Sequence, residues 1–126
     1  MRNVNVALKE RFVSSVMSGD KNGVRAALAD DFVLRQSKGH PYVGVYRGAE
    51  GFLAAVDKLM STYAIETLKE VGAYWSDDPD HAIFEFEMGG KISATGQPFQ
   101  ASILEHWTFK DGKLIAITPY WFEIPG

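Results

Sequence analysis

The sequence contains no cysteine. This absence excludes disulfide bonds and thiol catalysis, and it fits a protein of the reducing cytoplasm. No apolar run approaches the length of about 20 residues that a membrane-spanning helix needs. The opening residues, MRNVNVALKERF, are polar and charged where a signal peptide would be apolar. We therefore expect a soluble, cytoplasmic protein with no membrane partner.

A surplus of positive charge is also missing. Thirteen Lys and Arg residues stand against sixteen Asp and Glu residues, which gives a net charge of -3, and no basic run occurs. A surface that binds nucleic acid would need such a surplus, so we expect no nucleic-acid partner.

The spacings that hold metals and cofactors are absent too. His40, His81 and His106 lie too far apart in the sequence for a typical metal-binding pattern. The glycines within 44–51 do not follow a strand as a phosphate-binding loop would, and no nucleophile elbow occurs. We therefore expect neither a metal nor a cofactor.

The residues that are present suffice for one domain over 1–126. Hydrophobic residues make up 46% of the chain, and neither a linker nor a repeat is visible. Val4, Leu8, Phe12 and Val16 recur at every fourth position, which predicts an amphipathic first helix with these four on its buried face. Asp20 is the predicted N-cap of a short second helix.

The remaining pattern predicts helices packed against a sheet. FVLRQ alternates as a strand, residues 37–48 read as an irregular loop, and a third helix carries Phe52 and Tyr63 on its apolar stripe. Antiparallel strands follow, separated by turns, at about 64–76, 81–90, 97–110 and 113–123. Helices that precede such a meander predict an α+β fold.

The last predicted strand, IAITPYWFEI, is apolar on both faces, so each face must be covered. The helices can cover only the inner face. We therefore predict a homodimer that packs sheet against sheet through the outward-facing residues His106, Thr108, Thr118, Tyr120 and Phe122.

One strand carries an acid in an apolar row. In ASILEHWTF, residues 101–109, Ile103, Glu105 and Trp107 share a face. In a dry pocket the pKa of Glu105 would rise toward neutrality, which suits a catalytic acid or base. Alternatively, Glu105 is a structural acid that pairs with an arginine or with a backbone group.

Taken together, these segments resemble the nuclear transport factor 2-like superfamily. The resemblance covers nearly the whole chain and depends on the motifs SGDKNGVRAALADDFV, YVGVYRG, DGKL and PYWFE. The chain is most similar to ketosteroid isomerases and SnoaL-like polyketide cyclases. This implies a cone-shaped, curved antiparallel sheet wrapped around three N-terminal helices, with a pocket inside. Because the superfamily also includes dehydratases, hydrolases and noncatalytic binding modules, the fold does not decide the function.

The resemblance also implies roles for single residues. Glu105 matches the protonated acid that assists the oxyanion in the isomerases and the general acid/base of the cyclases. The tyrosine and the aspartate base of the isomerases fall on Phe12 and Gln36, which lack the hydroxyl and the carboxylate. Trp121 matches a tryptophan that lines the pocket. A standard ketosteroid isomerase is therefore not expected.

Further candidates have ordinary structural explanations as well. Gln36 either orients a ligand or bonds to the loop that follows it, and His40 is either a proton shuttle at the pocket mouth or an exposed loop residue. Aromatic residues could line a pocket for a hydrophobic ligand or belong to the core, namely Phe12, Tyr42, Tyr46, Phe52, Phe84, Phe86, Trp107 and Trp121.

The leading hypothesis is a cofactor-independent isomerase, cyclase or dehydratase. It would transfer a proton beside the carbonyl group of a small hydrophobic molecule. The alternative is a noncatalytic ligand-binding or dimerisation module on the same scaffold. An epoxide hydrolase of the limonene type would need an Asp-Arg-Asp constellation, which the predicted pocket residues do not provide.

Overall fold

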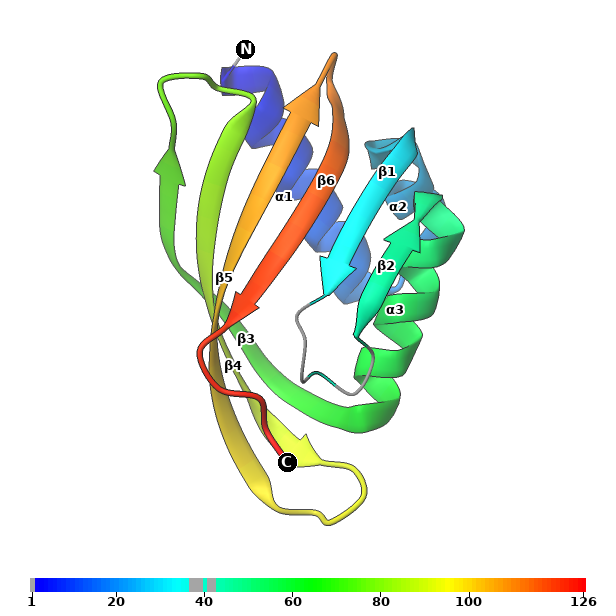
Figure 1. Ribbon diagram of the computed structural model, residues 1–126, viewed down its shortest axis with the longest axis vertical. Helices are drawn as coiled ribbons and strands as arrows, with labels where there is room; N and C mark the ends of the chain where they lie inside the picture. Colours follow the sequence, from blue (N-terminus) through cyan, green and yellow to red (C-terminus); the bar gives the residue numbers. More distant parts are fainter. Residues whose placement is uncertain (1, 37–39, 41–42) are drawn as a thin grey trace.

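A computed structural model describes residues 2–36, 40 and 43–126. Three helices and a six-stranded sheet form a single layered arrangement, with α1 behind the sheet and α3 beside it (Figure 1). The elements are α1 (Arg2–Ser18), α2 (Lys21–Ala27), β1 (Leu28–Gln36), β2 (Gly44–Arg47), α3 (Gly48–Thr62), β3 (Tyr63–Trp75), β4 (His81–Ile92), β5 (Pro98–Lys110) and β6 (Lys113–Trp121).

The sheet has the strand order β2-β1-β6-β5-β4-β3 and curves around the helices (Figure 1). This confirms the predicted α+β fold with a cone-like sheet around three helices. The sheet is mixed, however, because β1 runs parallel to β6 while every other neighbouring pair is antiparallel. No tight turn joins β1 to β6, so the hairpin pattern of the other strands does not dictate their relative direction.

The predicted loop at 37–48 contains a strand. Residues 44–47 form β2, which pairs antiparallel with β1 from Gln36↔Gly44 to Val33↔Arg47. Glycines at both ends hid this short strand from the sequence pattern, although Val45 and Tyr46 are good strand formers. The prediction of an irregular loop was wrong for 44–47, while residues 37–39 and 41–42 lie outside the described part.

Helix α1 differs from its predicted stripe. Leu8 and Phe12 are buried as predicted, but Val4 is exposed and Lys9 is buried. The ammonium of Lys9 lies 2.8 Å from Glu70 and 3.1 Å from Glu10, so the charge enters the protein paired with two carboxylates. The spacing of apolar residues cannot predict that a lysine is buried, because its burial depends on an ion pair with a residue of a distant strand.

The residues predicted to cap a helix or to form a tight turn have these roles in the structure. Asp20 caps α2 by accepting a hydrogen bond from the backbone N–H of Gly23 at 3.0 Å. Asp111 and Gly112 both have positive φ, 51° and 76°, as the tight turn between β5 and β6 requires. In the described part of the chain, no helix is long and apolar enough to cross a membrane.

The two faces of the sheet have different surroundings. The inner face packs on α1 and α3, whereas no described helix covers the face turned toward the viewer in Figure 1. Four large apolar side chains of this outer face expose between 42% and 58% of their surface, namely Tyr74, Ile83, Leu104 and Tyr120. This face is where the sequence predicts a second copy of the chain.

Candidate functional site

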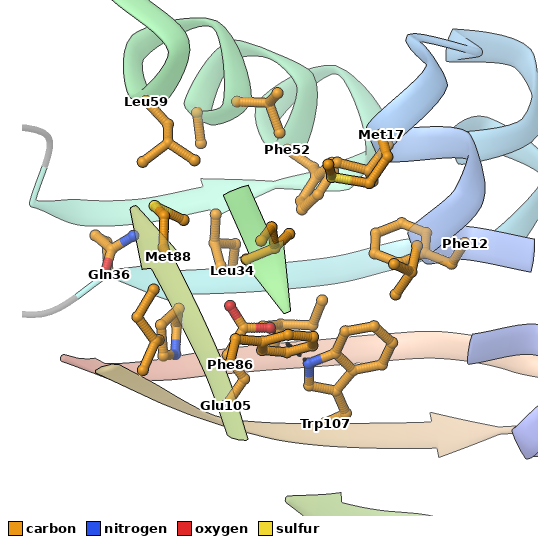
Figure 2. A pocket seen from close by; sticks show the side chains of 18 of the residues that line it. Phe12, Met17, Leu34, Gln36, Phe52, Leu59, Phe86, Met88, Glu105 and Trp107 are labelled. Atoms are coloured by element: carbon orange, nitrogen blue, oxygen red, sulfur yellow. Dashed lines mark hydrogen bonds between the residues drawn. The ribbon is translucent and has the colours of Figure 1, made fainter. Parts of the chain in front are cut away.

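A cavity of about 140 Å³ lies between helices α1 and α3 and the inner face of the sheet. Its walls are apolar except for two side chains, Gln36 and Glu105, in the part of the chain that the structure describes. Figure 2 shows Gln36 and Met88 at one end and Phe12 at the other.

Most of the predicted pocket residues contribute to this cavity. Helices α1 and α3 each supply one phenylalanine, and strands β1, β4, β5 and β6 supply the other predicted residues. The predicted residues that line it are Phe12, Gln36, Phe52, Phe86, Glu105, Trp107 and Trp121.

Other predicted residues lie behind or beside the cavity. Phe84 is fully buried beneath Trp107, with ring centroids 4.9 Å apart, and belongs to the core. Tyr46 lies on β2, where the Lys58 ammonium sits 5.1 Å from the centre of its ring. His40 is buried against Trp121 rather than exposed, with ring centroids 4.7 Å apart. None of these three lines the cavity as described, and Tyr42 lies outside the described residues.

Strand β5 directs Glu105 into the cavity, as its alternation predicts (Figure 2). The indole N–H of Trp107, two residues further along the same face, donates to Glu105 Oε1 at 2.9 Å. Burial raises the pKa of Glu105 to about 7, and the Trp107 hydrogen bond offsets part of this increase. No arginine or lysine of the described ranges pairs with this carboxyl. Glu105 is therefore a half-buried acid that faces the cavity and changes protonation state near neutral pH.

The second polar group of the cavity comes from the end of β1. Gln36 Oε1 accepts a hydrogen bond from the indole N–H of Trp121 at 3.1 Å. The sequence left open whether Gln36 orients a ligand or bonds to the loop that follows it. The structure shows a partner that neither alternative included, Trp121 of β6. This bond fixes both side chains at the wall of the cavity.

His40 is not placed to exchange protons readily at neutral pH. Burial lowers its pKa to about 4, so its imidazole is neutral at pH 7. His40 is not among the residues that line the cavity, and its ring packs against that of Trp121, which does line it. The role of a proton shuttle stays a prediction for which the geometry offers no direct path.

Sequence reasoning missed the aliphatic part of the lining. These residues come from the inner faces of α1, α3 and the strands, and the sequence could not separate them from ordinary core residues. They are Val13, Val16, Met17, Leu34, Ala55, Val56, Leu59, Leu68, Met88, Ile103, Ile117 and Pro119. In the described ranges, no group of three or more His, Asp or Glu side chains gathers as a metal site.

Comparison with known proteins identifies the family and the fold of this chain. The family model of the SnoaL-like domain matches residues 10–117. No curated protein matches the chain.

Solved structures share the fold at low sequence identity. An NTF2-like protein from Burkholderia xenovorans LB400 is 20% identical, with a TM-score of 0.81 over 96% of this chain and 91% of that one. A candidate SnoaL-like polyketide cyclase from Jannaschia sp. CCS1 is 15% identical, with a TM-score of 0.79 over 96% and 87%. A protein of unknown function with a cystatin-like fold from Xanthomonas campestris is 15% identical, with a TM-score of 0.78 over 94% and 90%.

The fold, the inward acid on β5 and the family match agree with the resemblance seen in the sequence. The chain belongs to the SnoaL-like domain family.

Proposed function

We propose that this protein is a cofactor-independent enzyme that transfers a proton beside the carbonyl group of a small hydrophobic molecule. The observation that carries the proposal is Glu105, a carboxyl buried in an apolar cavity with a pKa of about 7. At neutral pH both its acid and its base form are populated, which is the condition under which one group can accept a proton and return it.

The chemistry follows from this single group. Glu105 as carboxylate removes a proton from the carbon next to the carbonyl, and the electron pair of that C–H bond moves toward the carbonyl oxygen. Glu105 then holds the proton and returns it to another carbon in an isomerisation or to the leaving oxygen in a dehydration. In a cyclisation the enolate carbon attacks a second carbonyl carbon of the same molecule, and the proton goes to the alkoxide oxygen that this attack forms. Isomerisation, cyclisation and dehydration all use this sequence. The similarity to a candidate polyketide cyclase supports the reaction class.

Deuterium uptake in D₂O tests the proposal. Acetophenone and 2-cyclohexenone are incubated with the wild-type chain and with Glu105→Gln, and exchange at the carbon beside the carbonyl is followed by NMR. We expect the wild-type chain to accelerate exchange and the variant to lose this acceleration. Equal rates with both proteins, or a Glu105 carboxyl that titrates at its ordinary pKa by isotope-edited infrared spectroscopy, would contradict it.

A noncatalytic binding module is the second candidate. In the described lining, Glu105 is the only ionisable side chain, and Phe12 and Gln36 cannot transfer protons. Among the described residues, proton transfer therefore has no second acid or base in the cavity. Binding of the ketones without any deuterium uptake would favour this candidate.

A further inference from the structure

A second hollow adjoins the cavity on its helix side. It has a volume of about 360 Å³ and lies between the end of α1, the turn into α2, and α3. It shares Val16, Met17, Phe52 and Val56 with the cavity at Glu105. The two spaces are therefore neighbours that meet at these four residues.

Met17 is the side chain best placed to connect them. It lines the cavity, the outer hollow and a third, smaller hollow of about 170 Å³ beside Lys9. It is 52% exposed, so it can change rotamer without repacking the core. Methionine is unbranched and flexible, and it adapts easily to a ligand. Figure 2 shows Met17 next to Phe52 at the helix side of the cavity.

The volumes indicate a ligand in two parts. The inner cavity of about 140 Å³ is close to the space of about 150 Å³ that holds one benzene ring in an engineered apolar cavity. It is smaller than the range of about 300–1,000 Å³ that is usual for ligand pockets. The cavity and the outer hollow together fall within that range. The inner part therefore fits a single ring and not a fused polycyclic compound.

The outer hollow is more polar than the inner cavity. Its lining is mixed, with apolar side chains from α1 and α3 beside Ser15, Ser18, Asp20, Lys21 and Asp57, so two carboxylates stand against one ammonium group. The smaller hollow is likewise acidic, since Lys9 is paired with both Glu10 and Glu70. An excess of negative charge favours a cationic or neutral polar group and disfavours a carboxylate or phosphate.

We propose that the outer hollow is a second binding subsite, and that the ligand is a single-ring carbonyl compound with a polar, uncharged or cationic arm. The ring occupies the cavity at Glu105, and the arm passes Met17 and lies between α1 and α3 near Asp57. This inference rests on the function proposed above, because it places the carbonyl ring at Glu105.

Matched probes test the arm separately from the ring. Acetophenone supplies the ring alone, 4-(3-aminopropoxy)acetophenone adds a cationic arm, and 4-(3-carboxypropoxy)acetophenone adds an anionic arm of similar length. Binding is measured by NMR titration against the wild-type chain, Asp57→Asn and Asp77→Asn. Asp77 is an exposed acid of the distant β3–β4 turn and serves as the matched control.

We expect the aminopropoxy probe to bind at least about fivefold more tightly than acetophenone, because the arm gains polar contacts. The carboxypropoxy probe should show no such gain. Asp57→Asn should reduce the advantage of the amine on the order of threefold, as expected for one exposed charge, and Asp77→Asn should leave it unchanged.

The outcomes separate the two proposals. If acetophenone binds and perturbs Glu105 but the three probes have equal affinity, or the anionic probe binds best, the subsite is overturned while the proposed function stands. An advantage of the amine that is the same in Asp57→Asn and wild type also overturns it. If acetophenone does not bind, the proposed function fails at its first requirement.

Discussion

Glu105 makes the stability of the protein depend on pH in an unusual direction. Its pKa in the folded chain, about 7, lies above the value of about 4.3 expected in the unfolded chain. The folded state therefore binds more protons than the unfolded state between these two values. Stability falls as the pH rises through this window, and the loss is complete above the folded pKa.

The first prediction at the residue scale follows from this loss of stability with rising pH. Glu105→Gln should raise the free energy of unfolding at pH 8 by up to about 2–3 kcal/mol, because glutamine removes the buried negative charge. At pH 4 the two proteins should be nearly equal, since Glu105 is then mostly protonated in the unfolded chain as well as in the folded one. Urea denaturation at both pH values measures the difference. Glu87→Gln, at an exposed position on β4, is the control, and clear destabilisation by Glu105→Gln at pH 8 would indicate a structural acid instead.

The second prediction concerns the hydrogen bond that Trp107 donates to Glu105. This bond stabilises the charged carboxylate and so lowers its pKa. Trp107→Phe keeps an aromatic ring but removes the N–H, and the pKa of Glu105 should rise by at least about one unit, since hydrogen bonds to charged groups are worth about 1.5–3 kcal/mol. Isotope-edited infrared titration measures the shift. Trp75→Phe, whose indole does not touch Glu105, should leave the titration unchanged, and an unshifted Trp107→Phe would contradict this role.

The sequence predicted some residue positions well and others poorly for physical reasons. A strand has only two faces, so the alternation at 101–109 was enough to direct Glu105 inward. The same alternation could not tell whether Phe84 lines a cavity or the core behind it, because both environments are apolar. The buried position of His40 depends on contacts with Trp121, 81 residues away, which no local pattern encodes.

At the scale of elements, the hairpins were predictable and the long-range pairing was not. Turn residues such as Asp111 and Gly112 specify a reversal of the chain within a few residues. The parallel pairing of β1 with β6 joins segments about 80 residues apart and leaves no local trace. Strand β2 is only four residues long and lies between glycines, so its signal was too short to detect.

The third prediction belongs to the paired strands β3 and β4, which change register between Ile65 and Thr67. Gly90 lies at this point, and a Cβ there would overlap the carbonyl oxygen of Ala64. Gly90→Ala should destabilise the fold by about 1–3 kcal/mol, because the backbone of β3 must move.

Gly89→Ala is the matched control for this prediction. The nearest atom to a Cβ at Gly89 is the hydroxyl oxygen of the Thr67 side chain, at 2.8 Å, which can rotate away. Thermal and urea denaturation should therefore show a smaller loss for Gly89→Ala than for Gly90→Ala. Equal losses would mean that the general cost of alanine in this strand, and not the contact with Ala64, determines the effect.

At the scale of the whole molecule, one surface is not covered by any of the described helices. The outer face of the sheet carries Tyr74, Ile83, Leu104 and Tyr120, all substantially exposed. Leu104 and Tyr120 are direct neighbours on β5 and β6, and Tyr74 and Ile83 are neighbours on β3 and β4. Exposed apolar pairs of this kind on one face of a sheet commonly mark an interface.

The fourth prediction is that two chains associate through this face, as the two-sided apolarity of the last strand indicated. Tyr120→Glu places a charge opposite Leu104 and should convert a dimer into a monomer, because a buried unpaired charge costs far more than the lost contact. Met60→Glu, an equally drastic change at an exposed position of α3 on the helix side, should leave the dimer intact. Sedimentation velocity distinguishes the two masses. A wild-type chain that sediments as a monomer at high concentration would show that the patch has another role, and a dimer that survives Tyr120→Glu would place the interface elsewhere.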